Sequence, residues 1–218
     1  MSQLIMNHFI SAILGWSYFL CWSFSFYPQL LLNFKKKSSK GVSIHFIIMN
    51  SIGFFAYTLY TIKSDHLISQ SDIVFACHAL LLSLFVYIQY CYYEGFQIHY
   101  FITLVVSIVV VQCLTSDYLG YIKVFISVLK YLPQLYQNYQ RQSTKGYSTI
   151  AVVLDVNGGI LSIGQLCFDG MVLHLSFKEI ITSNFAKLGL GTVSLVMDTL
   201  LLIQIARYKE RNDYLVLK

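Results

Sequence analysis

Apolar segments of about 20 residues recur along the chain, and this is the length that a helix needs to cross the hydrocarbon core of a bilayer. We count seven of them, at 8–33, 43–62, 71–92, 97–114, 118–139, 148–168 and 185–206. Only 11% of the residues are charged, against about 25% in a typical soluble domain. A segment inside a bilayer must satisfy its own backbone polar groups, which favours helices. The sequence therefore predicts an all-α polytopic membrane protein with seven transmembrane helices.

One unusual segment occurs twice in the chain. YPQLLLNFKKKSSKGVS at 27–43 and LPQLYQNYQRQSTKGYS at 132–148 align without a gap, at an offset of 105 residues. An internal repeat fixes the architecture, so we expect spans 1–3 and 5–7 to form two parallel three-helix bundles. Because each unit has an odd number of helices, the second copy would be inverted in the membrane if it followed the first directly. Span 4 is therefore expected to be a linker helix that restores the parallel orientation. The predicted parts are a first bundle at 1–93, the linker helix at 94–117, a second bundle at 118–207 and a tail at 208–218.

Basic residues gather on one side of this seven-span arrangement. Ten of the 15 Lys and Arg residues follow spans 1, 5 and 7. The positive-inside rule places that side in the cytosol, with the N-terminus on the lumenal side. We therefore attribute the net charge of +5 to membrane orientation, and expect the bilayer rather than nucleic acid as partner. The five cysteines have neither CxxC nor CxxH spacing, so the sequence predicts no metal site.

Each copy of the repeat carries a proline inside an apolar span. Proline cannot donate a hydrogen bond to the carbonyl four residues earlier, so both helices are expected to kink. A static bend would explain one such proline, whereas repetition in both halves favours a pair of hinges. The hinge candidates are Pro28, Gln29, Pro133 and Gln134.

Polar side chains recur at helical spacing in spans 1, 5, 6 and 7. A charge at the bilayer centre costs about 2.5–3.5 kcal/mol, so these side chains are expected to line an internal cavity. Lysines beside aspartates suit a zwitterion, and aromatic rings could contact an apolar or disulfide midsection. In the alternative, Lys130 forms a permanent pair with an aspartate. The candidate substrate-binding residues are Trp22, Phe26, Asn50, Lys123, Lys130, Tyr131, Gln134, Asn138, Asp155 and Lys187.

Three aspartates are candidates for proton coupling: Asp72, Asp155 and Asp198. A carboxyl group held away from water can carry a proton at the acidity of an organelle lumen. Asp155 aligns with Asn50 in the repeat, and an amide cannot titrate, so the residues alone favour Asp155. Asp72 begins span 3 and fits a helix cap equally well.

The duplicated Pro-Gln pair, the asparagine after it and the Ser-x-Lys-Gly-x-Ser turn resemble the PQ-loop family. The second half, with KYLPQLYQNYQRQSTKGYS, VVLDVNGG and KLGLGTVSLVMD, is similar to the cystinosins within that family. The resemblance implies proton-coupled export of L-cystine from the lysosome or vacuole lumen to the cytosol by alternating access. It also implies that Asp155 and Asp198 are the coupling acids, with protons as coupling ion and no cofactor. The chain departs from the family at His45, where an acid is usual, and at Ala151, where an amide is usual.

Other functions of the same fold stay open at this stage. They are transport of another amino acid or a sugar, and binding of a cargo peptide by a sorting receptor. A peptide receptor of this fold would need arginines in its pocket, and the three arginines all lie at or beyond one set of helix ends. The chain has no nucleophile–base motif, so it is not expected to be an enzyme. Tyr214–Leu217 fits a tyrosine-based sorting signal for an adaptor, or belongs to a plain tail.

Overall fold

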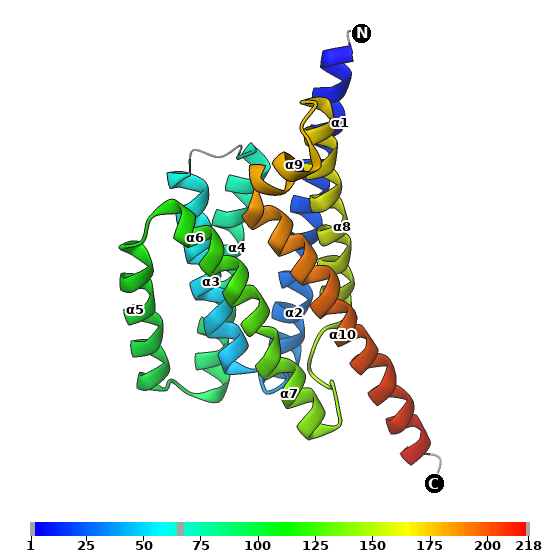
Figure 1. The fold of residues 1–218 in the computed structure, drawn as a ribbon. Coiled ribbons are helices and arrows are strands. Elements are labelled where there is room, and N and C mark those ends of the chain that lie inside the picture. The colour runs from blue at the N-terminus through cyan, green and yellow to red at the C-terminus, as the bar shows by residue number, and fades with distance from the viewer. Residues whose placement is uncertain (1–2, 65–67, 217–218) are drawn as a thin grey trace.

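A computed structural model describes residues 3–64 and 68–216, with side chains for 5–64 and 68–208, and these parts contain helices and no strands. Tyr214–Leu217 lies outside the residues whose side chains are described. The helices in chain order (Figure 1) are α1 (Gln3–Phe24), α2 (Phe26–Lys36), α3 (Ile44–Lys63), α4 (Gln70–Glu94), α5 (Ile98–Gln112), α6 (Ser116–Leu129), α7 (Tyr131–Arg141), α8 (Thr149–Val172), α9 (Phe177–Ser183) and α10 (Phe185–Val216).

The distribution of polar side chains is that of a membrane protein. Five segments are long and apolar enough to cross a bilayer: Ile5–Lys36, Ile44–Lys63, Gln70–Glu94, Thr149–Val172 and Phe185–Tyr208. Large apolar side chains such as Phe85 and Val106 are exposed on the outside, while Lys123, Asn138 and Asp198 are buried. Apolar groups face outward and polar groups lie in the interior, as expected of a polytopic membrane protein.

The first and fifth predicted spans are each interrupted, at the position that the prolines predict. α1 ends at Phe24 and α6 ends at Leu129, and each of these residues lies four before a proline. Their carbonyls are the groups that the proline ring would meet in a continuous helix, so the regular helix is interrupted there. The interruptions thus lie where the prolines predict them, and bending at these positions stays a prediction.

The helices pack with a two-fold pattern. α3 packs on α4 and α8 packs on α10, while α1 lies against α8 and α6 lies against α3. The first helix of each repeat is thus placed against the second helix of the other repeat. The apolar helix α5 lies at the edge of the bundle, mainly against α3 (Figure 1). The short helix α9, between α8 and α10, was not predicted from the sequence.

The loops that follow α2 and α7, residues 37–43 and 142–148, lie at one end of the bundle, here named the PQ end. The N-terminus and α9 lie at the opposite end, named the Asp72 end (Figure 1). The two loops touch where Gly41 meets Gly146, so closely that a Cβ on Gly41 would overlap the backbone of Gly146. Gly146 also has a φ of 97°, which other residues rarely adopt. Glycine at both positions lets the backbones of the two repeats meet.

Candidate functional site

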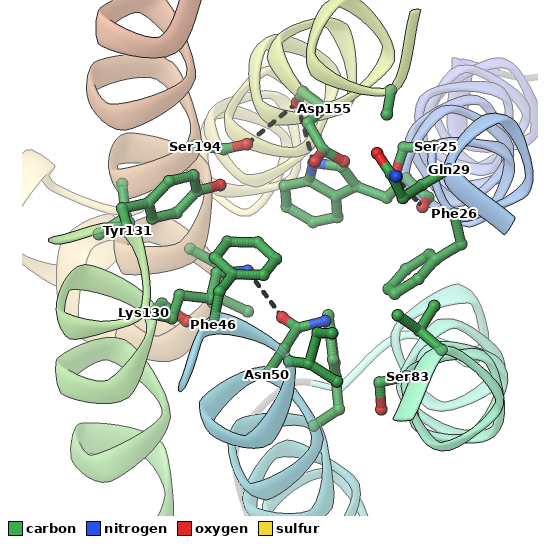
Figure 2. A pocket seen from close by; sticks show the side chains of 18 of the residues that line it. Ser25, Phe26, Gln29, Phe46, Asn50, Ser83, Lys130, Tyr131, Asp155 and Ser194 are labelled. Carbon is green, nitrogen blue, oxygen red and sulfur yellow. Dashed lines mark hydrogen bonds between the residues drawn. The ribbon is translucent and has the colours of Figure 1, made fainter. Parts of the chain in front are cut away.

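A cavity lies between the two repeats, near the middle of the bundle. Side chains from α1, α2, α3, α4, α6, α7, α8 and α10 surround it (Figure 2). Its lining residues are Trp22, Ser25, Phe26, Gln29, Val42, Phe46, Ile47, Asn50, Phe54, Phe75, Ser83, Val86, Lys123, Ser127, Lys130, Tyr131, Tyr147, Ala151, Asp155, Leu190, Val193 and Ser194. The cavity combines a wall of aromatic rings with a few charged and amide groups, as small-molecule sites do.

The structure brings together most of the residues that the sequence predicts for substrate binding. Those that line the cavity are Trp22, Phe26, Asn50, Lys123, Lys130, Tyr131 and Asp155. Three others do not line it. Gln134 and Asn138 are buried at the PQ end, and Lys187 is buried at the Asp72 end.

Two lysines present their ammonium groups to the cavity. Lys130 donates a hydrogen bond to the Asn50 side chain at 2.8 Å, and its Nζ lies 5.1 Å from the centre of the Phe46 ring. The Nζ of Lys123 lies 3.5 Å above the Phe54 ring, a cation–π contact. Among the described side chains, neither lysine has a carboxylate within ion-pair distance, and the permanent Lys130–aspartate pair is not present. Both cations are thus held by neutral groups beside the cavity.

Asp155 and Asp198 lie in two successive layers. Asp155 lines the cavity, and its backbone carbonyl accepts a hydrogen bond from the Trp22 indole at 3.0 Å. Asp198 lies behind the lining, where Tyr131 donates to its Oδ2 at 3.0 Å and the Ser194 Oγ is 2.7 Å away. The same Ser194 Oγ lies 3.1 Å from the Asp155 carbonyl. Ser194 thus lies within hydrogen-bond distance of the Asp198 carboxyl group and of the Asp155 backbone carbonyl, and its one hydroxyl proton can serve only one of them at a time.

Several lining residues were missed from the sequence. Phe46, Phe54 and Phe75 supply three of the seven aromatic side chains that line the cavity, and Ser83 adds a hydroxyl group from α4. An aromatic residue in a membrane helix can face lipid or the interior, so composition gives no signal for its direction. For Ser83 the signal is its place in the repeat, but the second copy carries Asp198 at an offset of 115 residues rather than 105.

A buried ion pair joins the repeats at the Asp72 end. The Asp72 carboxylate lies 3.0 Å from the Nζ of Lys187, and both side chains are almost fully buried. Gln165 accepts a hydrogen bond from the same ammonium at 2.6 Å, and Tyr18 donates to Asp72. Asp72 also closes a capping box with Ser69 at the start of α4. Asp72 is therefore both a helix cap and a contact between the halves.

At the PQ end the glutamine of each Pro-Gln pair binds the loop of the other repeat. Gln29 accepts from the Ser148 N–H at 2.9 Å and donates to the Gly146 carbonyl at 3.0 Å. Gln134 accepts from the Ser43 N–H at 2.9 Å and donates to the Gly41 carbonyl at 3.2 Å. The cavity is thus flanked by an ionic contact at one end and a reciprocal amide contact at the other.

The family follows from the repeat itself. The profile of the PQ loop repeat matches residues 10–70 and 115–173. The two matches cover more than half of the chain and contain both Pro-Gln pairs. The chain belongs to the PQ-loop repeat family.

Curated relatives extend this similarity over nearly the whole chain. It is 36% identical to a "Cystinosin homolog" of Dictyostelium discoideum, over 89% of this chain and 80% of the relative. It is 32% identical to a "Cystinosin homolog" of Caenorhabditis briggsae, over 92% of this chain but only 58% of the relative. It is 27% identical to a "Cystine transporter" of Saccharomyces cerevisiae, over 92% of this chain and 94% of the relative. The chain is thus a cystinosin-type member of the family.

Proposed function

We propose that this protein exports L-cystine, together with protons, from an acidic lysosomal or vacuolar lumen to the cytosol. The observation that carries the proposal is the pair of lysines beside Asp155 in a cavity lined by aromatic rings. Cystine has a carboxylate and an ammonium at each end and a disulfide between them. The relatives named as cystinosins and as a cystine transporter support the same substrate.

The cavity offers a group for each part of cystine. Lys130 and Lys123 are held by an amide and a ring, so a substrate carboxylate can bind them without first displacing a carboxylate of the protein. Asp155 can accept a hydrogen bond from a substrate ammonium. Phe46, Phe54 and Phe75 supply apolar walls for the disulfide midsection. Because the sulfur atoms are polarizable, contacts with ring edges are favourable.

Proton coupling is assigned to Asp155 and Asp198. A carboxyl group that binds a proton loses its charge, so its bonds to neighbours change with the proton. A protonated Asp198 would donate to Ser194, whose hydroxyl would then donate to the Asp155 carbonyl. The network therefore offers a complete set of hydrogen bonds in either state of Asp198. Asp72 is assigned to closing the halves, because it is paired with Lys187 away from the cavity.

For the arrangement in the membrane we propose seven spans, which adds α5 and the α6–α7 pair to the five long apolar segments. The three-helix bundles are residues 1–93 and 118–207, with 94–117 as linker and 208–218 as tail. The basic ends of α2 and α7 place the PQ end in the cytosol and the N-terminus in the lumen. Alternating access then requires the Asp72 end and the PQ end to open in turn, with bending at Pro28 and Pro133.

The test is flux of radiolabelled cystine into proteoliposomes, with and without an acidic outer side. The wild type should show gradient-stimulated flux, and Asp155→Asn should reduce it to the level of empty vesicles. Asp117→Asn, at an exposed position at the start of α6, is the matched control and should keep the flux. Absence of cystine flux by folded wild-type protein would refute the substrate. Other amino acids, sugars and short peptides would then be assayed in the same vesicles.

A further inference from the structure

Two chains of amide side chains lie at the PQ end, one in each repeat. In the first, Gln29 donates to Asn33 at 2.8 Å, Asn33 donates to Gln89 at 2.9 Å, and Gln89 donates to the Leu30 carbonyl at 3.0 Å. We name these three side chains the first amide chain. Gln89 belongs to α4, so the chain connects α2 to α4 within one half.

The second repeat builds the same chain from Gln134, Asn138 and Gln204. Gln134 donates to Asn138, Asn138 donates to Gln204, and Gln204 donates to the Leu135 carbonyl, each at 3.0 Å. We name these side chains the second amide chain. Its last member belongs to α10, so it connects α7 to α10. Two independent copies of one hydrogen-bond pattern indicate that the pattern has a function.

Each amide chain allows one orientation of its members. A backbone carbonyl can only accept, so Leu30 requires the NH₂ group of Gln89, whose oxygen is then turned toward Asn33. Asn33 in turn presents its oxygen to Gln29. The oxygen of Gln29 is thereby left for the Ser148 N–H of the other repeat, which can only donate. The orientation of Gln29 is thus determined by Gln89 through two intervening hydrogen bonds.

We propose that Gln89 and Gln204 are positioning residues that hold Gln29 and Gln134 in the orientation that closes the PQ end. The inference rests on the proposed alternating-access function and assigns to it two residues that line no part of the cavity. Without Gln89, the Asn33 amide loses its fixed acceptor, and Gln29 can rotate away from the Gly146–Ser148 loop. The same holds for Gln204, Gln134 and the Gly41–Ser43 loop.

The contacts that must break on opening fit this assignment. The amide chains lie within each half, whereas the bonds from Gln29 and Gln134 to the loops cross between halves. When the halves separate, the chains can stay intact and keep the glutamines oriented for closing again. A network of polarised hydrogen bonds inside protein is stronger than its separate members, so loss of one end weakens the whole.

The experiment measures access to the cavity directly and needs no substrate. Ala151→Cys places a thiol on the cavity wall, close to the PQ end. Its reaction rate with a membrane-impermeant maleimide is measured in sealed vesicles oriented with the PQ end outward. The rate of the same protein without Ala151→Cys is subtracted, to remove the contribution of the native cysteines. In this background, Gln89→Met and Gln204→Met should each raise the rate about tenfold, and Gln29→Met should do the same. Gln140→Met, at an exposed position on α7, is the control and should leave it unchanged.

A second readout separates positioning from damage to the fold. If the PQ end opens more often, the KM for cystine presented from the PQ end should fall, while the KM from the Asp72 end should rise. Misfolding would reduce the amount of active protein and leave both KM values unchanged. Should the methionine variants fail to fold, Gln89→Glu and Gln204→Glu are measured instead. Glutamate has nearly the shape of glutamine, but a carboxylate oxygen takes the place of the NH₂ group that donates to the leucine carbonyl.

An unchanged maleimide rate in folded Gln89 and Gln204 variants would overturn the inference. The labelling result holds even if cystine is not the substrate, because it reports the opening of the PQ end alone. Failure of the proposed substrate would instead appear as absence of cystine flux in the wild type with normal labelling. The two failures are therefore distinguishable.

Discussion

The buried ion pair between Asp72 and Lys187 connects single residues of the two halves, at a place where either charge alone would be costly. Removing one partner of a buried pair typically costs about 3–5 kcal/mol, because the other charge is left uncompensated. Asp72→Asn and Lys187→Met should therefore each lower the melting temperature of the purified protein by roughly 10 °C. Scanning fluorimetry in detergent measures this directly.

The double variant Asp72→Asn/Lys187→Met distinguishes pairing from general damage. It should regain at least half of the lost melting temperature, since no unpaired charge remains. Lys178→Met, on the exposed surface of α9, is the control and should have little effect. If the loss in the double variant equals the sum of the two single losses, the residues do not interact energetically.

At this scale the sequence predicts cavity residues where helical spacing gives a direction. Lys123 and Ser127 follow one face of α6 and Lys130 comes directly after it, and the structure places all three on the cavity wall. Gln89 and Gln204 were not predicted, although they hold equivalent positions. The offset between the repeats is 105 residues at Leu30 and Leu135 but 115 at Gln89 and Gln204. The insertion that contains α9 changes the offset and conceals the second set of equivalent residues, including Asp72 and Lys187.

Among the elements, α9 carries a pH-dependent cap. Ser176 donates from its hydroxyl group and its backbone N–H to Glu179, at 2.6 and 2.7 Å. These hydrogen bonds hold the pKa of the Glu179 carboxyl below its ordinary value. A group with a lowered pKa contributes stability above its unfolded pKa of about 4.3, and this is lost as the pH falls through the lower folded pKa. The cap is therefore expected to persist at the pH of an acidic lumen.

Hydrogen exchange tests this expectation. Amide protection of 177–183, corrected for intrinsic rates, should be constant between about pH 7 and 5 and should fall below about pH 4. Glu179→Gln keeps the capping box, because glutamine can accept the same bonds, but it removes the titration. A decrease in protection with the same midpoint in Glu179→Gln would contradict the role of the carboxyl group.

The contact between the two loops depends on glycine. In Gly146→Ala the left-handed backbone costs about 1–2 kcal/mol, and the added methyl group meets the backbone of Gly41. The melting temperature should fall by about 3–8 °C, and maleimide access from the PQ end should rise. Gly164→Ala, where the methyl group would meet open space, is the matched control. An unchanged melting temperature and access in Gly146→Ala would show that the loops tolerate separation.

The helices themselves were largely predictable. The predicted span 43–62 agrees within one residue with α3 (Ile44–Lys63), and 71–92 agrees within two with α4 (Gln70–Glu94). A long apolar segment in a bilayer has few conformations other than a helix that satisfy its backbone. Proline fixes the breaks at Phe24 and Leu129 through backbone geometry alone. α9 was missed because its seven residues mix polar and apolar side chains and are too short for a periodic pattern.

Across the whole molecule, the helix packing is repeated between the halves, while the charges at the cavity are not. Lys123, Lys130, Asp155 and Asp198 all belong to the second half. Their equivalents in the first half are Tyr18, Ser25, Asn50 and Ser83, which are neutral. The first half thus supplies amides, hydroxyl groups and rings to a cavity whose charges come from the second half. The position of the acid, and not only the total charge, is then expected to matter for transport.

Exchanging Asn50 and Asp155 tests this asymmetry with the net charge unchanged. In Asn50→Asp/Asp155→Asn, the new carboxylate would lie at the position that accepts the 2.8 Å hydrogen bond from Lys130. Lys130 and the acid would then neutralise each other, so neither would be free for the substrate or the proton. Gradient-stimulated cystine flux should fall to the level of empty vesicles, as in Asp155→Asn alone.

Gln140→Glu, at an exposed position in the last turn of α7, is the control for adding a carboxylate outside the cavity and should keep the flux. Retention of gradient-stimulated flux in the exchanged variant would mean that either half can hold the coupling acid. In that case the carboxylate introduced at Asn50 would bind and release the proton during transport although it is paired with Lys130. Proton coupling would then not depend on which half carries the acid. Loss of flux with an unchanged melting temperature would instead tie coupling to an acid that Lys130 does not neutralise.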